Sequence, residues 1–295
     1  MSDRIPRIVR ASRPTLEGAG VRLRRAFGNG DEHVFDPFLM LDDFRGDDPA
    51  DYRAGFPWHP HRGIETITYM LEGEVDHSDS LGNAGRIGPG DVQWMTAGGG
   101  IIHQEMPRGD ERGRMGGFQL WLNLPAEFKM TEPRYQGFAA AEIPVEKEDG
   151  ATIRVVAGRV GEVEGPVMND WVSPEYLDVA LSPGASWRHP TSAGFTVWAY
   201  VFEGAVRFGP ASDPDLVDPG WIVAEPGRVV LFDDGGWVSA IAGDAGGRFL
   251  LGSGRPLREP IAWRGPIVMN YPRELDEAWR ELEAGTFARH HVAGV

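Results

Sequence analysis

Short runs of apolar and β-branched residues, separated by Gly, Pro and Asp, fill most of the sequence. Val, Ile, Tyr, Trp and Thr dominate these runs, which is typical of short β-strands joined by tight turns. We expect strands at Ile64–Leu71, Val92–Met95, Gly117–Leu122, Ile153–Ala157, Val197–Phe202 and Val229–Phe232. The pattern therefore predicts a mainly β protein.

One segment near the C-terminus has a helical period instead of a strand period. Between residues 274 and 284, apolar positions recur every three or four residues and so fall on one face of a helix. These positions are Leu275, Ala278, Trp279 and Leu282. Gly285 follows, and Gly favours the left-handed conformation that ends helices. We therefore predict one short C-terminal helix.

A faint internal repeat divides the sequence into two halves. Residues 69–75, Tyr-Met-Leu-Glu-Gly-Glu-Val, are echoed by residues 200–206, Tyr-Val-Phe-Glu-Gly-Ala-Val, 131 positions later. A Pro-Gly turn follows each copy. This order of strand, Glu-Gly turn, strand and Pro-Gly turn is how a small antiparallel barrel is assembled. We therefore predict two barrels, at residues 1–140 and 150–295, with a linker or an edge strand near residues 138–150.

Composition and charge exclude several classes of protein. The chain is 41% hydrophobic and 25% charged, as in folded water-soluble proteins, and no apolar run approaches the roughly 18 residues that cross a bilayer. The first residues, MSDRIPRIVRASRP, carry positive charge without an apolar core after it, so we expect no secretory signal and a cytoplasmic protein. The net charge of −15 argues against nucleic acid and anionic membranes as partners, because both would be repelled.

The sequence contains no cysteine. This excludes disulfides, thiolate nucleophiles and every metal site with Cys ligands. Any metal must therefore be held by imidazole and carboxylate groups, and the spacing of these groups indicates where.

Two pairs of candidate ligands occur in the N-terminal half, and in each pair the residues are two apart. His59 and His61 form the first pair, and His103 and Glu105 form the second. Because residues two apart in a strand point to the same face, two such pairs on neighbouring strands can converge on one ion. Among the other histidines, His77, His189, His290 and His291 do not form such a pair, and we do not expect them to bind a metal.

The spacing alone leaves the carboxylate ligand open. Glu65 lies four residues after His61, on the same side of a continuing strand, in the His-x-His-x-x-x-Glu spacing of the general cupin metal motif. Glu105, paired with His103, is the alternative. With either one, three imidazoles and one carboxylate suit a divalent ion such as Fe(II), with Mn, Co, Ni, Cu and Zn as competitors.

Longer stretches of the sequence resemble the pirin family, within the cupin superfamily. The stretches that carry the resemblance are HPHRGIET at 59–66, LEGE at 71–74, IGPGDVQWMTAG at 87–98, GIIHQEMP at 100–107, DPFL at 36–39, PLREP at 256–260 and GPIVMN at 265–270. They cover nearly the whole chain in the family's order. Trp58 departs from the pattern, since many pirins have proline there.

The resemblance implies a bicupin fold, with two antiparallel jelly-roll barrels and a metal in the N-terminal one only. It implies that iron is bound by His59, His61, His103 and Glu105, and that Glu65 is an inner-barrel residue or a hydrogen-bond partner of a ligand. The C-terminal barrel would lack a metal. The residues that correspond there to the four ligands are His189, Thr191, Ala240 and Ala242.

The resemblance also implies two functions. Some pirins are quercetin 2,3-dioxygenases, so it implies a mononuclear non-haem iron dioxygenase that opens a flavonol or a related enolisable aromatic ring with O₂. Glu105 would then accept the proton of the substrate hydroxyl. The alternative is a non-catalytic, iron-dependent regulatory protein that acts through contacts with another protein.

Overall fold

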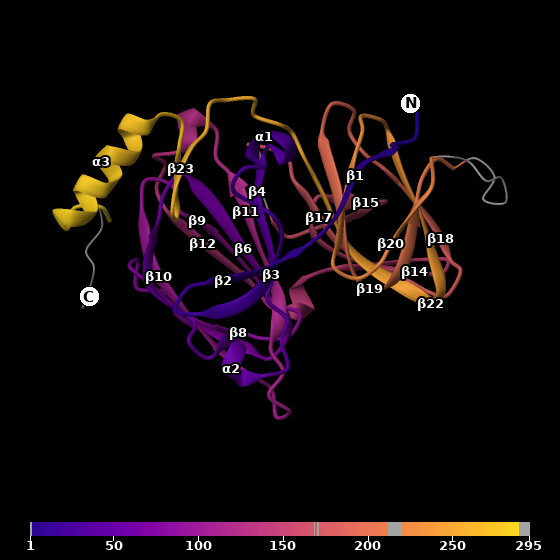
Figure 1. The fold of residues 1–295 in the computed structure, drawn as a ribbon, viewed down its shortest axis with the longest axis horizontal. Coiled ribbons are helices and arrows are strands. Elements are labelled where there is room, and N and C mark those ends of the chain that lie inside the picture. Colours follow the sequence, from indigo (N-terminus) through magenta and orange to yellow (C-terminus); the bar gives the residue numbers. More distant parts are fainter. Residues whose placement is uncertain (1, 168, 170, 212–219, 289–295) are drawn as a thin grey trace. The chain divides into compact units, whose positions relative to one another are not determined.

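The computed structural model describes residues 2–167, 169, 171–211 and 220–288 (Figure 1). These residues form a mainly β fold with few helices, as the sequence predicts. The helical elements are α1 (Glu32–Phe35), α2 (Pro49–Tyr52), η1 (Ala126–Phe128), η2 (Ala140–Glu142) and α3 (Pro272–Glu283). None of the helices in these residues is long and apolar enough to span a membrane.

The strands and the helix expected from the sequence are all present. The six strands are β6 (Ile64–Glu72), β9 (Val92–Thr96), β11 (Gly116–Asn123), β14 (Ala151–Ala157), β19 (Thr196–Phe208) and β21 (Arg228–Phe232). Helix α3 buries Leu275 and Ala278. Gly285 follows it with a φ of 69°, the left-handed conformation that closes helices.

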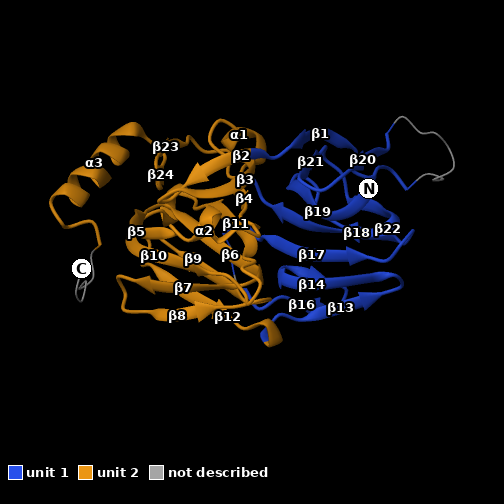
Figure 2. Ribbon diagram, turned by 60° about the horizontal axis from the view of Figure 1, so that its bottom comes forward, with its two compact units in different colours: residues 1–13, 142–256 blue, residues 14–141, 257–295 orange. Residues whose placement is uncertain are grey.

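The chain folds into two compact units (Figure 2). Unit 1 contains Met1–Arg13 and Glu142–Pro256, and unit 2 contains Pro14–Ala141 and Leu257–Val295. Each unit thus includes an end of the chain that the predicted division at 1–140 and 150–295 assigns to the other. The physical reason is strand pairing and packing: β1 (Pro6–Ala11) pairs with β21 in unit 1, and α3 packs with Ile102 in unit 2.

Unit 2 contains two antiparallel sheets and a hairpin. The larger sheet has the order β12-β9-β6-β11-β4-β3-β2, and the smaller has the order β5-β10-β7-β8. The further strands of this unit are β2 (Arg13–Glu17), β3 (Val21–Phe27), β4 (Phe38–Asp43), β5 (Phe56–His61), β7 (Glu74–Asp79), β8 (Ala84–Ile87), β10 (Ile101–Arg108), β12 (Arg134–Phe138), and the hairpin β23 (Ala262–Arg264) and β24 (Ile267–Met269). Both predicted ligand pairs therefore lie in the smaller sheet, on the neighbouring strands β5 and β10.

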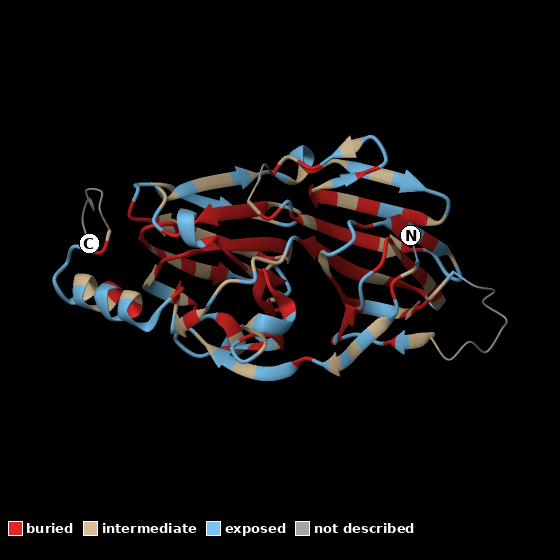
Figure 3. Cartoon of the chain, turned by 90° about the horizontal axis from the view of Figure 1, so that it is seen from above, coloured by how far each residue is buried: buried red, intermediate tan, exposed pale blue. Residues whose placement is uncertain are grey.

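Unit 1 is built around one antiparallel sheet with the order β1-β21-β19-β22-β17-β14-β13, to which β18 and β20 add. Its remaining strands are β13 (Val145–Glu148), β15 (Arg159–Val160), β16 (Val163–Glu164), β17 (Glu175–Leu181), β18 (Ser186–Pro190), β20 (Ile222–Ala224) and β22 (Trp237–Gly254). Strand β13, at the sheet edge, comes from the segment around residues 138–150. The buried residues of both units concentrate on their strands (Figure 3).

The sequence repeat corresponds to equivalent strands in the two units. Strand β6 lies between β9 and β11, just as β19 lies between β21 and β22. The repeated Glu-Gly turns share a backbone conformation, because Gly73 and Gly204 have φ values of 68° and 61°. The strand paths among the described residues are open, so the finer prediction of two closed jelly-roll barrels is not confirmed.

Candidate metal centre

Strands β5 and β10 bring three histidines together on one face of the smaller sheet. The strands are antiparallel, with His59 opposite His103 and His61 opposite Ile101. One ring nitrogen from each of His59, His61 and His103 lies within 4.8 Å of the others. As the sequence predicts, the two-residue spacing of His59 and His61 places both rings on the same face of the sheet, toward the ring of His103.

The ring nitrogens of His59 and His61 converge without a hydrogen between them. Nδ1 of His59 lies 2.9 Å from the Pro57 carbonyl, and Nδ1 of His61 lies 3.1 Å from the Pro266 carbonyl. A carbonyl only accepts, so each Nδ1 donates, and Nε2 of each neutral ring keeps its lone pair. The two Nε2 atoms are 3.1 Å apart. Two nitrogens bound at about 2.1 Å to one ion are roughly 3 Å apart when the angle between them is 90°.

His103 is fully buried, and neither of its ring nitrogens has a hydrogen-bond partner. A buried polar group without a partner is costly and uncommon. A metal ion bound to His103 would give one of these nitrogens a partner, so the residue fits the role of a ligand.

Burial favours the neutral form of His61 and His103. It holds the pKa of His61 well below its usual range, and the neighbouring His59 lowers it further. The pKa of His103 is lowered in the same way, by burial first and then by His59, His61 and His77. Neutral imidazole is the form that binds metals.

Glu105 adds a carboxylate from the same strand. It is buried, and its Oε1 accepts a hydrogen bond from the Thr68 hydroxyl at 3.1 Å. Glu105 lies directly opposite His77 on β7, and ligand atoms of Glu105, His77 and His103 form a second group within 4.8 Å. His103 thus belongs to both groups, whereas Glu105 is grouped with His77 and His103 and not with His59 or His61.

The structure brings His77 to the site, although the sequence predicts no metal-binding role for it. His77 is buried, with its ring stacked on Tyr135 and its Nε2 3.4 Å from a carboxylate oxygen of Asp79. The sequence gives only a weak indication that His77 belongs to the site, namely that His77 and Asp79 are two residues apart in a strand. Only the register of β7 against β10 shows that His77 lies opposite Glu105.

The other residues considered from the sequence lie elsewhere. Glu65 is buried and accepts a hydrogen bond from the Thr96 hydroxyl at 2.7 Å, outside both candidate groups. His189, in unit 1, is buried with its Nε2 3.1 Å from Glu175. His290 and His291 lie outside the described residues.

A cavity of about 610 Å³ opens onto the candidate site. This volume is in the range of small-molecule sites. Its wall includes His59, His61 and Glu105, together with the aromatic residues Phe56, Trp58, Trp121 and Trp263. The Trp121 ring lies edge-on to His61, with ring centroids 5.0 Å apart, and Trp263 lies 5.9 Å from Trp121. The site can therefore receive a flat aromatic molecule beside the ligand atoms.

An ion pair forms a polar part of the cavity wall. Arg25 donates two hydrogen bonds to the Asp42 carboxylate, at 2.8 and 2.7 Å. Burial raises the pKa of Asp42 to about 6, against the opposing effect of Arg25. This pair offers charge and hydrogen bonds to the polar substituents of a bound molecule.

Comparisons with known proteins agree with this geometry. Family models described as Pirin and as Pirin C-terminal cupin domain match residues 20–122 and 176–288. A pirin-like protein of Caulobacter vibrioides is 46% identical over 276 residues, 93% of this chain and 95% of the relative. The crystal structure of a quercetin 2,3-dioxygenase from Acinetobacter baumannii has a TM-score of 0.85 and 31% identity, and covers 97% of this chain and 99% of that one.

A more distant structure shares the fold. The nickel(II) complex of the bacterial pirin YhhW from Escherichia coli has a TM-score of 0.65 and 23% identity, over 84% of this chain and 98% of that one. At this identity the likeness shows the fold alone.

Proposed function

The chain belongs to the pirin family, and from that premise we propose that it is a mononuclear non-haem iron dioxygenase, which opens a flavonol or a related enolisable aromatic ring with O₂. One observation carries the proposal: His59 and His61, at the wall of an aromatic-lined cavity of about 610 Å³, present ring nitrogens that converge with that of the buried His103. The similarity to the A. baumannii quercetin 2,3-dioxygenase supports this choice of reaction.

In this proposal, His59, His61, His103 and Glu105 hold one Fe(II) ion. Three neutral imidazoles and one carboxylate suit Fe(II), and the same set accepts Mn, Co, Ni, Cu or Zn. When bound, the ion supplies Lewis acidity toward an enol or phenol oxygen and one-electron chemistry with O₂.

The residues of the chain bind the substrate and accept its proton. Trp121 and Trp263 offer flat faces for an aromatic ring, in a cavity that is otherwise largely apolar. The Glu105 carboxylate lines the same cavity, where it can take the proton of the substrate hydroxyl. The Thr68 hydroxyl lies 3.1 Å from Oε1 of Glu105 and 2.8 Å from the side-chain oxygen of Gln119, so these three polar groups lie together beside the site.

Oxygen uptake by three proteins tests the proposal. After anaerobic Fe(II) loading, the wild type, Glu105→Gln and His61→Ala would each be assayed with quercetin and with a panel of flavonols and catechols, and their iron content measured. We expect substrate-dependent uptake by the wild type. We expect at least about 10²–10⁴-fold slower uptake by Glu105→Gln, because a general base and an iron ligand are both removed, and no iron in His61→Ala. Equal uptake by all three proteins would rule out the assigned site.

The alternative is a non-catalytic, iron-dependent regulator that binds another protein. The observation in its favour is that unit 1 has no candidate metal cluster among its described residues. Catalysis at one metal does not require such a second unit, whereas binding to another protein can use its surface. One bound iron without uptake on any compound, together with a stoichiometric partner that is released when iron is oxidised, would favour this alternative.

A further inference from the structure

We infer that the hairpin β23–β24 of the C-terminal segment is a positioning element of the metal centre, because its Pro266 carbonyl orients the ring of His61 so that Nε2 faces the ion. The inference rests on the metal centre proposed above. It concerns how firmly unit 2 holds a metal, and it gives the C-terminal segment a role in that function.

The two histidines of β5 are oriented in different ways. The partner of His59 Nδ1 is Pro57, in the same strand. The partner of His61 Nδ1 is the carbonyl of Pro266, which is 205 residues away in the sequence. Each carbonyl selects the tautomer with hydrogen on Nδ1, which leaves Nε2 free as a ligand atom. His59 is therefore fixed locally, whereas His61 depends on a distant segment.

The hairpin is bound directly to the residues that follow His61. The Val268 backbone N–H donates to the Arg62 carbonyl at 3.1 Å. The buried side-chain nitrogen of Lys129, Nζ, donates to the carbonyls of Gly63 and Val268 at 2.9 and 3.0 Å, and so joins both segments. The contact is close, because a Cβ on Gly63 would collide with the Val268 carbonyl.

Helix α3 and the residues after it anchor the same point. The buried Arg62 guanidinium pairs with the Glu281 carboxylate and donates to the Phe287 carbonyl at 3.2 Å. The Arg62 charge also lies over the Phe287 ring, 4.2 Å from its centroid. The neighbour of His61 is thus tied to the C-terminal segment from two sides, and the hairpin carbonyl has little freedom to leave the imidazole.

This arrangement predicts that a change in the hairpin turn weakens metal binding although no ligand is altered. Gly265 precedes Pro266 in this turn and has a φ of 58°, a conformation that β-branched residues strongly disfavour. An added Cβ there meets only Trp279, at 3.8 Å, so Gly265→Val changes the backbone without a collision.

Gly184 provides the matched control. It lies in a turn of unit 1, its φ is 67°, and an added Cβ meets nothing within 4 Å. Gly184→Val therefore imposes a similar backbone strain far in sequence from the hairpin.

The binding of Ni²⁺ to the wild type, to both Gly variants and to His59→Ala would be measured by isothermal titration calorimetry.

We expect about 10–100-fold weaker Ni²⁺ binding by Gly265→Val, as is typical when the partner of a ligand is lost. We expect less than a twofold change for Gly184→Val and no binding by His59→Ala. Equal affinities of the wild type and both Gly variants would overturn this inference and leave the metal centre intact. A wild type that binds no Ni²⁺ would overturn both.

A second measurement does not depend on the folding of Gly265→Val. Histidine ¹⁵N NMR of the metal-free wild type reports which nitrogen of each ring carries hydrogen. We expect hydrogen on Nδ1 of both His59 and His61, and a mixture of tautomers at His61 alone in Lys129→Met, which loosens the hairpin. Hydrogen on Nε2 of His61 in the wild type would overturn the inference.

Discussion

The two units place different side chains opposite a histidine in a pair of antiparallel strands. In unit 2, β5 and β10 set His59 opposite His103, and in unit 1, β18 and β22 set His189 opposite Val238. One imidazole therefore faces another in unit 2, whereas it faces an apolar side chain in unit 1. A single histidine cannot hold a divalent ion firmly, so among the residues that the structure describes, candidate metal ligands group only in unit 2.

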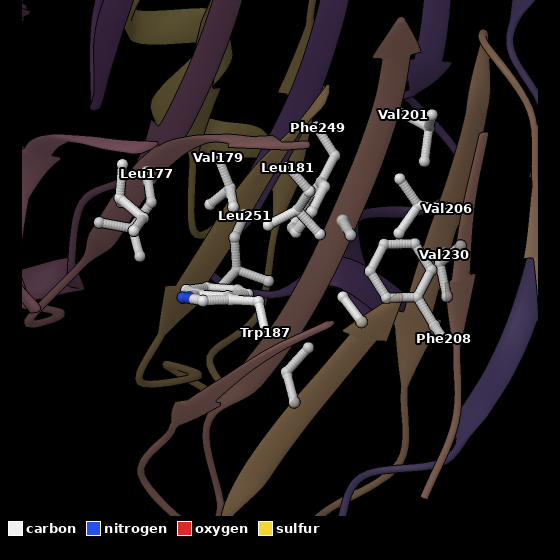
Figure 4. Packing of buried hydrophobic residues seen from close by; sticks show 14 of the residues in the cluster. Leu177, Val179, Leu181, Trp187, Val201, Val206, Phe208, Val230, Phe249 and Leu251 are labelled. Atoms are coloured by element: carbon white, nitrogen blue, oxygen red, sulfur yellow. The ribbon is translucent and has the colours of Figure 1, made fainter. Parts of the chain in front are cut away.

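The interiors of the two units differ as well, in how completely side chains fill them. In unit 1, aromatic residues such as Trp187, Phe208 and Phe249 fill the space between strands (Figure 4). His189 stacks on Trp187 and pairs with Glu175, so its ring already has partners. In unit 2, His103 has none for its ring nitrogens, and a cavity lies beside the histidines. Similar strands therefore serve either packing or metal binding, depending on a few inward-facing residues.

The largest expected difference between the two units appears when one histidine is removed from each. We expect His103→Ala to lose its bound metal, because one of three converging imidazoles is gone. His189→Ala should keep a full equivalent, since His189 has no second imidazole beside it. Metal content after Ni²⁺ loading and dialysis, measured by mass spectrometry, distinguishes the two. Metal loss in His189→Ala equal to that in His103→Ala would contradict the assignment.

The next largest effect should be on stability, and here a change in unit 1 should matter more than a change in unit 2. Phe249 is fully buried in the core of unit 1, so Phe249→Ala should lower the free energy of unfolding by about 3–5 kcal/mol. Phe56→Ala should cost less than half as much, because Phe56 is only partly buried, at the cavity wall of unit 2. Urea denaturation of both variants measures this. A larger loss for Phe56→Ala would mean that the cavity wall is the better packed region.

A smaller effect is expected at the aromatic wall. Trp263→Ala should raise KM for the aromatic substrate about tenfold, equivalent to about 1.4 kcal/mol, with little change in kcat. Trp263→Phe should restore most of the affinity. The control is Trp237→Ala, a partly buried tryptophan of unit 1 that lies beneath Arg188. Steady-state kinetics would contradict the proposed wall if Trp237→Ala raised KM as much as Trp263→Ala.

The last effect concerns the pH dependence of stability and one buried basic side chain in each unit. Burial lowers the pKa of Lys129 in unit 2 from 10.5 to about 7. Between these values the unfolded chain holds a proton that the folded chain has lost, so stability rises with pH, by at most about 1.4 kcal/mol per pH unit. Lys129→Met should remove this rise. Arg4→Met in unit 1 should leave it in place, because arginine stays protonated throughout this range.

Urea denaturation at pH 7, 8 and 9 checks this prediction. The stability of the wild type and of Arg4→Met should increase over this range relative to that of Lys129→Met. The same pH dependence in all three proteins would show that Lys129 keeps its proton in the folded state.

Local patterns predicted most of the fold and three of the proposed ligands. Alternating apolar runs located the strands, and the two-residue period placed His59 and His61 on one face. Spacing could not choose between Glu65 and Glu105, because both lie on the correct side of a strand. The choice depends on tertiary contacts: Glu65 accepts from Thr96, whereas Glu105 lies beside His103.

The remaining features depend on contacts between distant segments. The carbonyl of Pro266 is a backbone group, so its bond to His61 leaves no signature in the sequence. His77 has no second ligand at strand spacing apart from Asp79, and only the register of β7 against β10 reveals its place. The exchange of the chain ends between units follows from β1 pairing with β21, more than 200 residues later.

Anomalous X-ray diffraction from Fe(II)-loaded crystals, at the iron absorption edge, tests the central claim most directly. We expect a single iron peak in unit 2, between His59, His61 and His103, with Glu105 as the carboxylate nearest to it, and no peak in unit 1. A peak beside His189 and Glu175, or no peak in unit 2 after loading, would contradict this account.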